Sequence, residues 1–123
     1  MKWTLLVFAG AILFLVLTLR AAPELPLAAA REHLKKGALL VDVRTVEEFN
    51  AKHLTNAVNV PLDELKAKLP RRVIDKSRVL LLYCRSGRRS GLAEQQLRAL
   101  GYTNSFNIGS YEQAGKVVDG ATR

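Results

Sequence analysis

Residues 82–90 read LYCRSGRRS, and this stretch carries the strongest signal in the sequence. It contains Cys84, the only cysteine, at the point where an apolar run ends and a glycine-containing turn with three arginines begins. A strand that is apolar throughout is typical of a sheet covered on both faces. Ligands of such sheets collect beyond the carboxyl ends of the strands. The position of Cys84 therefore predicts a functional site at that edge.

Short apolar runs alternate with helical patterns along the remainder of the chain. We predict strands at residues 38–43, 57–60, 78–84 and 104–108, and helices at residues 27–36, 46–51, 62–69, 90–100 and 111–118. Thr45 and Glu48 have the spacing of a capping box, which would start the second helix. Pro70 is expected to end the third helix. Strands that alternate with helices of this length indicate an α/β fold with a parallel sheet.

The beginning of the chain differs from the rest in composition. Residues 3–19 contain no charged side chain, and one basic residue flanks them on each side. A core helix of this length would show a polar face. We therefore predict a signal anchor or signal peptide over residues 1–20, which would contact a membrane through residues 3–19. Residues 21–26 are expected to form a linker, and residues 27–123 a single folded domain.

The distribution of charge bears on localisation and on partners. An N-terminal apolar segment favours export, with an uncleaved anchor and the domain on the periplasmic side. The basic residues that follow the segment favour a domain that faces the cytoplasm, so both orientations stay open. The net charge of +8 indicates anionic partners, but the sequence contains no nucleic-acid-binding motif. We expect small anions rather than nucleic acid as partners, and a monomer.

The single cysteine limits the chemistry of the chain. It excludes an internal disulfide, a Cys-x-x-Cys redox pair and a cysteine-based metal cluster. The two histidines lack metal-ligand spacing, so we expect no metal and no cofactor. Cysteine reacts as the thiolate, whose formation is favoured by nearby arginines and by a helix N-terminus such as the one expected near Ser90. Gly87 would let the loop turn its amides inward as an anion-binding nest. These features together disfavour the other interpretation of Cys84, a buried structural cysteine followed by a charged surface turn.

Three blocks of the sequence carry a resemblance to a known family. The first block, residues 39–65, contains Asp-Val-Arg, Glu-Phe, His and Asn-Val-Pro in that order. The second block, residues 79–90, contains Cys-x-x-Gly-x-Arg-Ser, and residues 97–114 form the third block. In these blocks the chain resembles the rhodanese family of single-domain sulfurtransferases. The resemblance implies a doubly wound parallel sheet of five strands and a persulfide formed on Cys84. It also implies a substrate-binding loop that cradles the persulfide, consisting of Arg85, Ser86, Gly87, Arg88, Arg89 and Ser90.

The chemistry that the resemblance implies is a two-step sulfur transfer. The Cys84 thiolate would take a sulfur atom from a small anionic donor such as thiosulfate, and a thiol or cyanide would then accept it. Arg85 and Arg88 are the candidates for capturing the dianionic donor, because side chains of a cradle loop point outward. Arg89 would either share that role or anchor the loop through an ion pair.

Two other functions compete with sulfur transfer. Phosphatases and arsenate reductases of related fold use a longer loop, Cys-x5-Arg, whereas this chain has Ser90 at that position and Arg89 one residue earlier. The shorter loop favours sulfur over phosphoryl transfer. A non-catalytic binding or regulatory module is the second alternative, and the retention of Cys84 with its glycine and arginines argues against it.

Polar residues after the first strand are expected to support the site rather than to react. Asp42 and Arg44 end that strand near the same edge as the cysteine. Arg44 and Glu48 stand four residues apart and could form an ion pair. His53 corresponds to a family histidine that is chiefly structural, so we do not expect it to act as a base.

Overall fold

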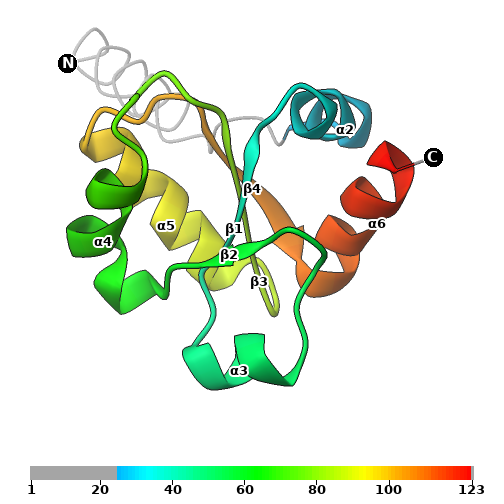
Figure 1. The fold of residues 1–123 in the computed structure, drawn as a ribbon, viewed down its shortest axis with the longest axis horizontal. Coiled ribbons are helices and arrows are strands. Elements are labelled where there is room, and N and C mark those ends of the chain that lie inside the picture. Colours follow the sequence, from blue (N-terminus) through cyan, green and yellow to red (C-terminus); the bar gives the residue numbers. More distant parts are fainter. Residues whose placement is uncertain (1–24, 123) are drawn as a thin grey trace, which may run out of the picture.

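The computed structural model describes residues 25–122, in which four strands form one parallel sheet. The strands are β1 (Leu39–Asp42), β2 (Val58–Asn59), β3 (Leu80–Cys84) and β4 (Ser105–Ser110). Their order in the sheet is β2-β1-β3-β4, so β3 is a central strand (Figure 1). Because all strands are parallel, their carboxyl ends lie at the same edge of the sheet. The last residue of β3 lies at this edge.

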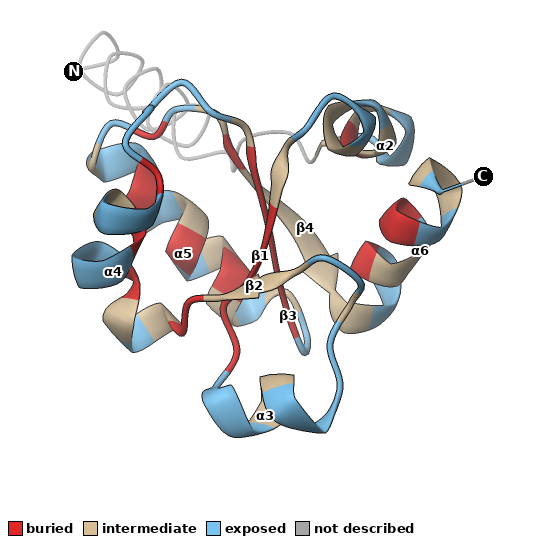
Figure 2. Cartoon of the chain, viewed as in Figure 1, coloured by how far each residue is buried: buried red, intermediate tan, exposed pale blue. Residues whose placement is uncertain are grey.

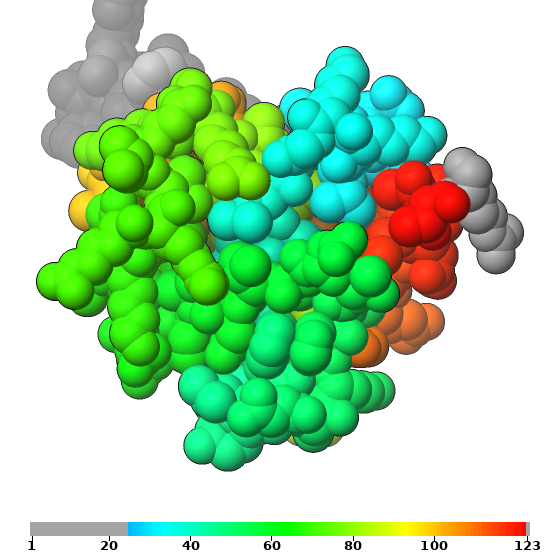
Figure 3. All heavy atoms as spheres, in the orientation of Figure 1, coloured from blue at the N-terminus to red at the C-terminus, as the bar shows by residue number. Residues whose placement is uncertain are grey.

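Within the described residues, six helical segments precede, connect or follow the strands. They are α2 (Leu27–Lys35), α3 (Val46–Ala51), the 3-10 helix η1 (Leu62–Glu64), α4 (Leu65–Arg72), α5 (Arg88–Ala99) and α6 (Tyr111–Ala121). Helices α4 and α5 cover one face of the sheet, α2 and α6 cover the other, and α3 lies beyond the carboxyl ends of the strands (Figure 1). In the space-filling view, atoms of α2, α3 and α4 form much of the face shown, with α6 at its margin (Figure 3).

Two apolar clusters, one on each face of the sheet, make up the core. Leu80, Leu82 and Cys84 belong to the cluster that includes side chains of α4 and α5. Leu81 and Tyr83 belong to the other cluster, with side chains of α2 and α6. All five residues of β3 are buried, as Figure 2 shows, and alternate residues of a strand point to opposite faces. The prediction of an apolar strand covered on both faces is therefore confirmed, and it places Cys84 on the α4–α5 side.

The predicted α/β fold with a parallel sheet is confirmed, but the expected number of strands is wrong for the described residues. The sheet has four strands there instead of five. The expectation of a fifth strand rested on the family resemblance alone, because the apolar runs of the sequence predict four strands. Before α2 the structure describes only Leu25 and Pro26, and neither belongs to a strand. Pro26 has no N–H to donate to a neighbouring strand.

Several helix boundaries differ from those expected. Helix α4 continues past Pro70 to Arg72, because Pro70 removes one backbone hydrogen bond while the buried Leu65 and Leu69 hold the helix against the sheet. Helix α5 begins at Arg88, two residues before Ser90. The predicted capping box is confirmed: the Thr45 side chain accepts from the Glu48 N–H, and the Glu48 side chain accepts from the Thr45 N–H.

The prediction of an anchor at residues 1–20 falls outside the described residues. It therefore stays a prediction, as does the linker apart from its last two residues. Within residues 25–122, the structure contains no helix that is both long enough and apolar enough to cross a bilayer.

Candidate active site

Cys84 is the last residue of β3, and its sulfur lies inside the turn that leads into α5. The residue has no exposed surface. The Gly87 N–H donates to Cys84 Sγ at 3.0 Å, and the Ser90 hydroxyl donates to the same sulfur at 3.4 Å. Gly87 has a φ of 91°, a left-handed conformation that favours glycine, and it is the N-cap of α5. Two donors from the loop and the first turn of the helix thus converge on one sulfur.

These contacts determine the acidity of the thiol. Burial acts to raise the pKa of Cys84, because a charged sulfur loses solvation there. Hydrogen bonds from the Ser90 hydroxyl and from the backbone of Ser90, Ser86 and Gly87 act in the opposite direction and outweigh burial. The pKa of Cys84 is therefore lower than its ordinary value of 9.0. A lowered pKa increases the fraction of the nucleophilic thiolate at neutral pH.

The remaining residues of the predicted loop divide by exposure. Arg85, Ser86 and Arg88 are exposed, whereas Arg89 is half-buried and Ser90 is buried. The backbone of Ser86 also forms an antiparallel bridge with Ser110 at the end of β4, which ties the loop to the neighbouring strand. Two arginines are thus available to solvent beside Cys84, as the sequence predicted.

Arg89 has an anionic partner within the protein. Its Nη1 lies 2.6 Å from Glu48 Oε1 and its Nη2 lies 3.0 Å from Glu48 Oε2. This pair lowers the pKa of Glu48 to about 2 and raises the pKa of Arg89. The expected pairing of Arg44 with Glu48 is wrong: Glu48 binds Arg89, and Arg44 binds another carboxylate. Local spacing predicted the pairing, whereas the tertiary structure brings α3 against the start of α5.

Asp42 and Arg44 form a buried ion pair. Arg44 Nη2 lies 2.6 Å from Asp42 Oδ2, and the Arg44 N–H donates to Asp42 Oδ1 at 2.9 Å. The Arg44 guanidinium also donates to the Lys52 carbonyl at 2.8 Å and lies 5.0 Å from the centre of the Tyr111 ring. Asp42 pairs in register with Tyr83, so its side chain shares the face of Tyr83 rather than that of Cys84. The expected supporting role of Asp42 and Arg44 stays a prediction.

His53 is also held by its surroundings. Its Nδ1 is 2.9 Å from the Phe49 carbonyl, and its ring stacks on that of Phe49 at 3.8 Å between centroids. In the part of the chain that the structure describes, no group of three or more His, Cys, Asp or Glu side chains is arranged to hold a metal ion.

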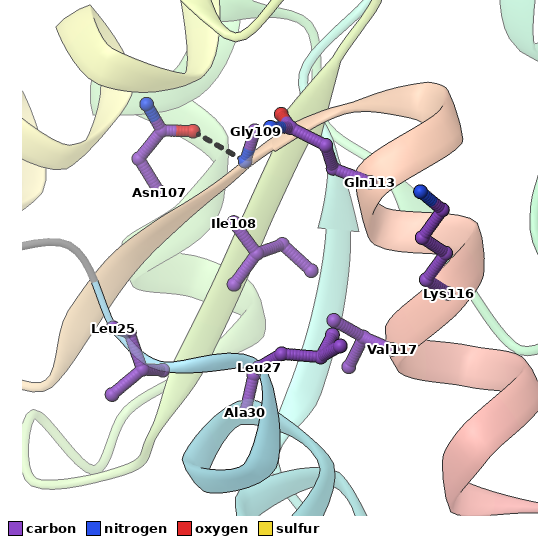
Figure 4. A pocket seen from close by; sticks show the side chains of 9 residues that line it. All are labelled: Leu25, Leu27, Ala30, Asn107, Ile108, Gly109, Gln113, Lys116 and Val117. Atoms are coloured by element: carbon purple, nitrogen blue, oxygen red, sulfur yellow. Dashed lines mark hydrogen bonds between the residues drawn. The ribbon is translucent and has the colours of Figure 1, made fainter.

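A separate cavity lies on the α2–α6 side of β4. Its volume is about 260 Å³, and Figure 4 shows its lining. The lining residues are Leu25, Leu27, Ala30, Asn107, Ile108, Gly109, Gln113, Lys116 and Val117. None of the predicted site residues is among them, so this cavity is distinct from the cysteine loop. Its β4 wall includes Asn107, whose side chain contacts the cysteine loop; no local motif in the sequence indicated that contact.

The fold agrees with what comparison with known proteins shows. The family model described as the rhodanese-like domain matches residues 27–114, and the chain belongs to this family.

Individual relatives extend this finding. Thiosulfate sulfurtransferase PspE of Escherichia coli is 39% identical over 69 residues, which cover 56% of this chain and 66% of that protein. The structure of the human single-domain sulfurtransferase TSTD1 is similar with a TM-score of 0.64 and 31% identity, covering 76% of this chain and 96% of that one. A rhodanese with anions from E. coli has a TM-score of 0.60 and 35% identity, covering 63% of this chain and 91% of that one.

Proposed function

We propose that the chain is a sulfurtransferase that carries a sulfane sulfur on Cys84, from thiosulfate or a similar anionic donor to a thiol or cyanide. The observation that carries this proposal is the hydrogen bonding of the Cys84 sulfur by Gly87 and Ser90, in a loop flanked by exposed arginines. Membership of the rhodanese-like family and the names of the relatives support it.

In the first step the Cys84 thiolate attacks the outer sulfur of thiosulfate. A new S–S bond forms on Cys84, the S–S bond of thiosulfate breaks, and sulfite leaves with the bonding electron pair. The lowering of the thiol pKa below its ordinary value supports this role, because it increases the fraction of thiolate without a separate general base.

In the second step a nucleophilic acceptor attacks the terminal sulfur of the persulfide. The acceptor takes that sulfur, and the Cys84 thiolate leaves with the electron pair of the S–S bond. The terminal sulfur of the persulfide is anionic, so N–H groups that point into the loop would stabilise it. The Gly87 N–H and the Ser90 hydroxyl already donate to the cysteine sulfur, and this supports such a cradle.

The arginines of the loop have different surroundings, and we assign them different roles. Arg85 and Arg88 are exposed and would attract a dianionic donor to the mouth of the site. Arg89 donates two hydrogen bonds to Glu48, so we assign it the anchoring role rather than donor capture.

The loop also bears on the alternative functions. A phosphatase or arsenate reductase requires an arginine that is free to bind a tetrahedral oxyanion. The loop has Ser90 in place of the arginine of Cys-x5-Arg, and Arg89 is engaged by Glu48. A non-catalytic module has no need of a sulfur held by two donors.

Intact-mass measurement of the full chain after incubation with thiosulfate tests the proposal. We expect a gain of one sulfur atom, its absence in Cys84→Ser, and its removal by cyanide. No gain at any thiosulfate concentration would overturn the thiosulfate-derived persulfide and favour the non-catalytic alternative. Turnover of an aryl phosphate by the wild type, lost in Cys84→Ser, would instead favour the phosphatase.

We also propose that residues 1–20 anchor the domain at a membrane, with the domain on the periplasmic side. The uncharged residues 3–19 support this. Fusion of the C-terminus to reporters that are active on only one side of the membrane tests the orientation. Activity of the cytoplasmic reporter alone would overturn it.

A further inference from the structure

The strand beside the cysteine loop, β4, is irregular where it faces the end of β3. Leu82 pairs with Asn107, but the next residue, Tyr83, pairs with Gly109, so Ile108 is an extra residue on β4. Such a bulge bends a strand and changes the direction of its side chains, and bulges are frequent next to active sites. This bulge lies opposite the last residues of β3, immediately before Cys84.

The side-chain amide of Asn107 connects the bulge to the cysteine loop. Its Nδ2 donates to the Gly87 carbonyl at 3.0 Å, and its Oδ1 accepts from the Gly109 N–H at 2.9 Å, the bond drawn in Figure 4. A carbonyl can only accept and an N–H can only donate, so one orientation of the amide satisfies both groups. Aspartate and leucine are similar in size to asparagine, but neither can make both bonds.

Gly87 contacts both Asn107 and the sulfur of Cys84, and so links the two. A Cβ at position 87 would lie 3.3 Å from the Gly109 Cα, so the backbones of the loop and the bulge are in close contact. The carbonyl of Gly87 accepts from Asn107, and the N–H of the same residue donates to Cys84 Sγ at 3.0 Å. The orientation of the Gly87 backbone therefore determines whether this one of the donors points at the sulfur.

We infer that Asn107 is a positioning residue for the reaction of Cys84, acting through Gly87; this inference rests on the proposed function. Asn107 holds the Gly87 carbonyl together with the Gly91 N–H, which donates to the same oxygen at 3.0 Å. By fixing this carbonyl, Asn107 favours the backbone conformation of Gly87 in which its N–H is directed at the sulfur in the thiolate and in the persulfide. The strand is in turn held from the helix side, because the backbone N–H of Asn107 donates to the Glu94 carboxylate of α5.

Asn104 provides a matched control. Its side-chain amide also donates to a backbone carbonyl, that of Ser77 at 2.7 Å, but it does so at the opposite end of β4. Loss of this contact removes a comparable hydrogen bond without affecting the loop. A comparison of the two asparagines therefore separates positioning of Gly87 from general stabilisation of the fold.

The experiment measures the alkylation of Cys84 by iodoacetamide as a function of pH in the full chain. Alkylation requires the thiolate but no sulfur donor. We expect Asn107→Leu and Asn107→Ala, which add no charge, to raise the midpoint of the pH profile by about one unit, so that the rate at neutral pH falls up to about tenfold. Asn104→Ala should lower the thermal midpoint of unfolding but retain the wild-type pH profile.

A profile of the Asn107 variants that coincides with that of Asn104→Ala would show a purely structural residue and overturn the inference. If the Asn107 variants do not fold, Gly91→Val is the second variant, because a Cβ at position 91 would lie 3.4 Å from Asn107 Nδ2 and the added methyl groups would displace the amide. An unchanged profile in Gly91→Val would also overturn it. Failure of the wild type to form a persulfide with thiosulfate would overturn the proposed donor, and the alkylation profile would still decide the role of Asn107.

Discussion

Arg89 and Glu48 are 41 residues apart in sequence and are joined by two hydrogen bonds of 2.6 and 3.0 Å. Glu48 belongs to α3, which follows β1, and Arg89 belongs to the first turn of α5, which follows β3. The pair therefore joins the segment that follows β1 to the segment that follows β3, at the carboxyl edge of the sheet. Because one end of the pair lies in the helix that begins at the cysteine loop, this contact holds the loop against α3.

The Arg89–Glu48 pair predicts a dependence of stability on pH. The pKa of Glu48 is lowered from 4.5 to about 2 in the folded protein, chiefly by the hydrogen bond from Arg89. A lowered folded pKa contributes stability that is present above 4.5 and is lost as the pH falls from 4.5 toward 2. Both side chains are about one-third exposed, so we expect Glu48→Gln to cost only about 1 kcal/mol at neutral pH.

Urea unfolding of the wild type and Glu48→Gln over this pH range tests that prediction. The difference in free energy of unfolding should be present at neutral pH and should shrink toward pH 2. Glu47→Gln is the control, because it removes a carboxylate from the same helix and leaves the Arg89–Glu48 pair in place. A difference that stays constant from neutral to acid pH would contradict the assigned cause.

The second prediction concerns Ser90, whose hydroxyl donates to Cys84 Sγ at 3.4 Å. Ser90→Ala removes this bond, so the pKa of Cys84 should rise toward its ordinary value of 9.0. The thiolate fraction at neutral pH should then fall by about three- to tenfold, and the alkylation rate with it. Ser77→Ala, far from the loop, is the control. Equal rates for wild type and Ser90→Ala at neutral pH would mean that the backbone donors alone determine the acidity.

The third prediction concerns the exposed arginines. Arg85→Gln and Arg88→Gln should each raise the KM for thiosulfate by about three- to tenfold at low ionic strength, because each removes a positive charge at the mouth of the site. Added salt should reduce the difference from the wild type. Arg78→Gln makes the same change in net charge in the turn before β3, and its KM should stay at the wild-type value. If all three substitutions raise the KM equally, the net charge of the protein, rather than the arginines beside Cys84, would determine the binding of thiosulfate.

The fourth prediction concerns the buried pair of Asp42 and Arg44. Asp42→Asn leaves the Arg44 guanidinium buried with a neutral partner, which should cost about 3–5 kcal/mol. The exposed pair of Glu64 and Lys68 is the comparison, and Glu64→Gln should cost less than about 1 kcal/mol. Urea unfolding measures both. A cost for Asp42→Asn no larger than that for Glu64→Gln would contradict the supporting role of Asp42.

Patterns that are local in sequence predicted individual strands and helices of this protein and the position of its cysteine loop. The apolar residues of β3 and the spacing of Thr45 and Glu48 identified a covered parallel strand and a capped helix, both of which the structure contains. Cys84 with its glycine and arginines identified the loop, since the conformation of a short turn depends on the residues within it. These signals depend on neighbours within a few residues, so the sequence alone reveals them.

Other features depend on which segments the sheet brings together. Glu48 is four residues from Arg44, yet it binds Arg89, because the parallel pairing of β1 and β3 places α3 beside the start of α5. Asn107 contacts Gly87 because its register with Leu82 places its side chain on the α4–α5 face of the sheet, where the cysteine loop leads into α5. No motif around Asn107 indicates that contact. The sequence by itself thus determined the position of the cysteine loop. Only the tertiary structure decided which side chains hold that loop, because those contacts join residues 20 and 41 positions apart.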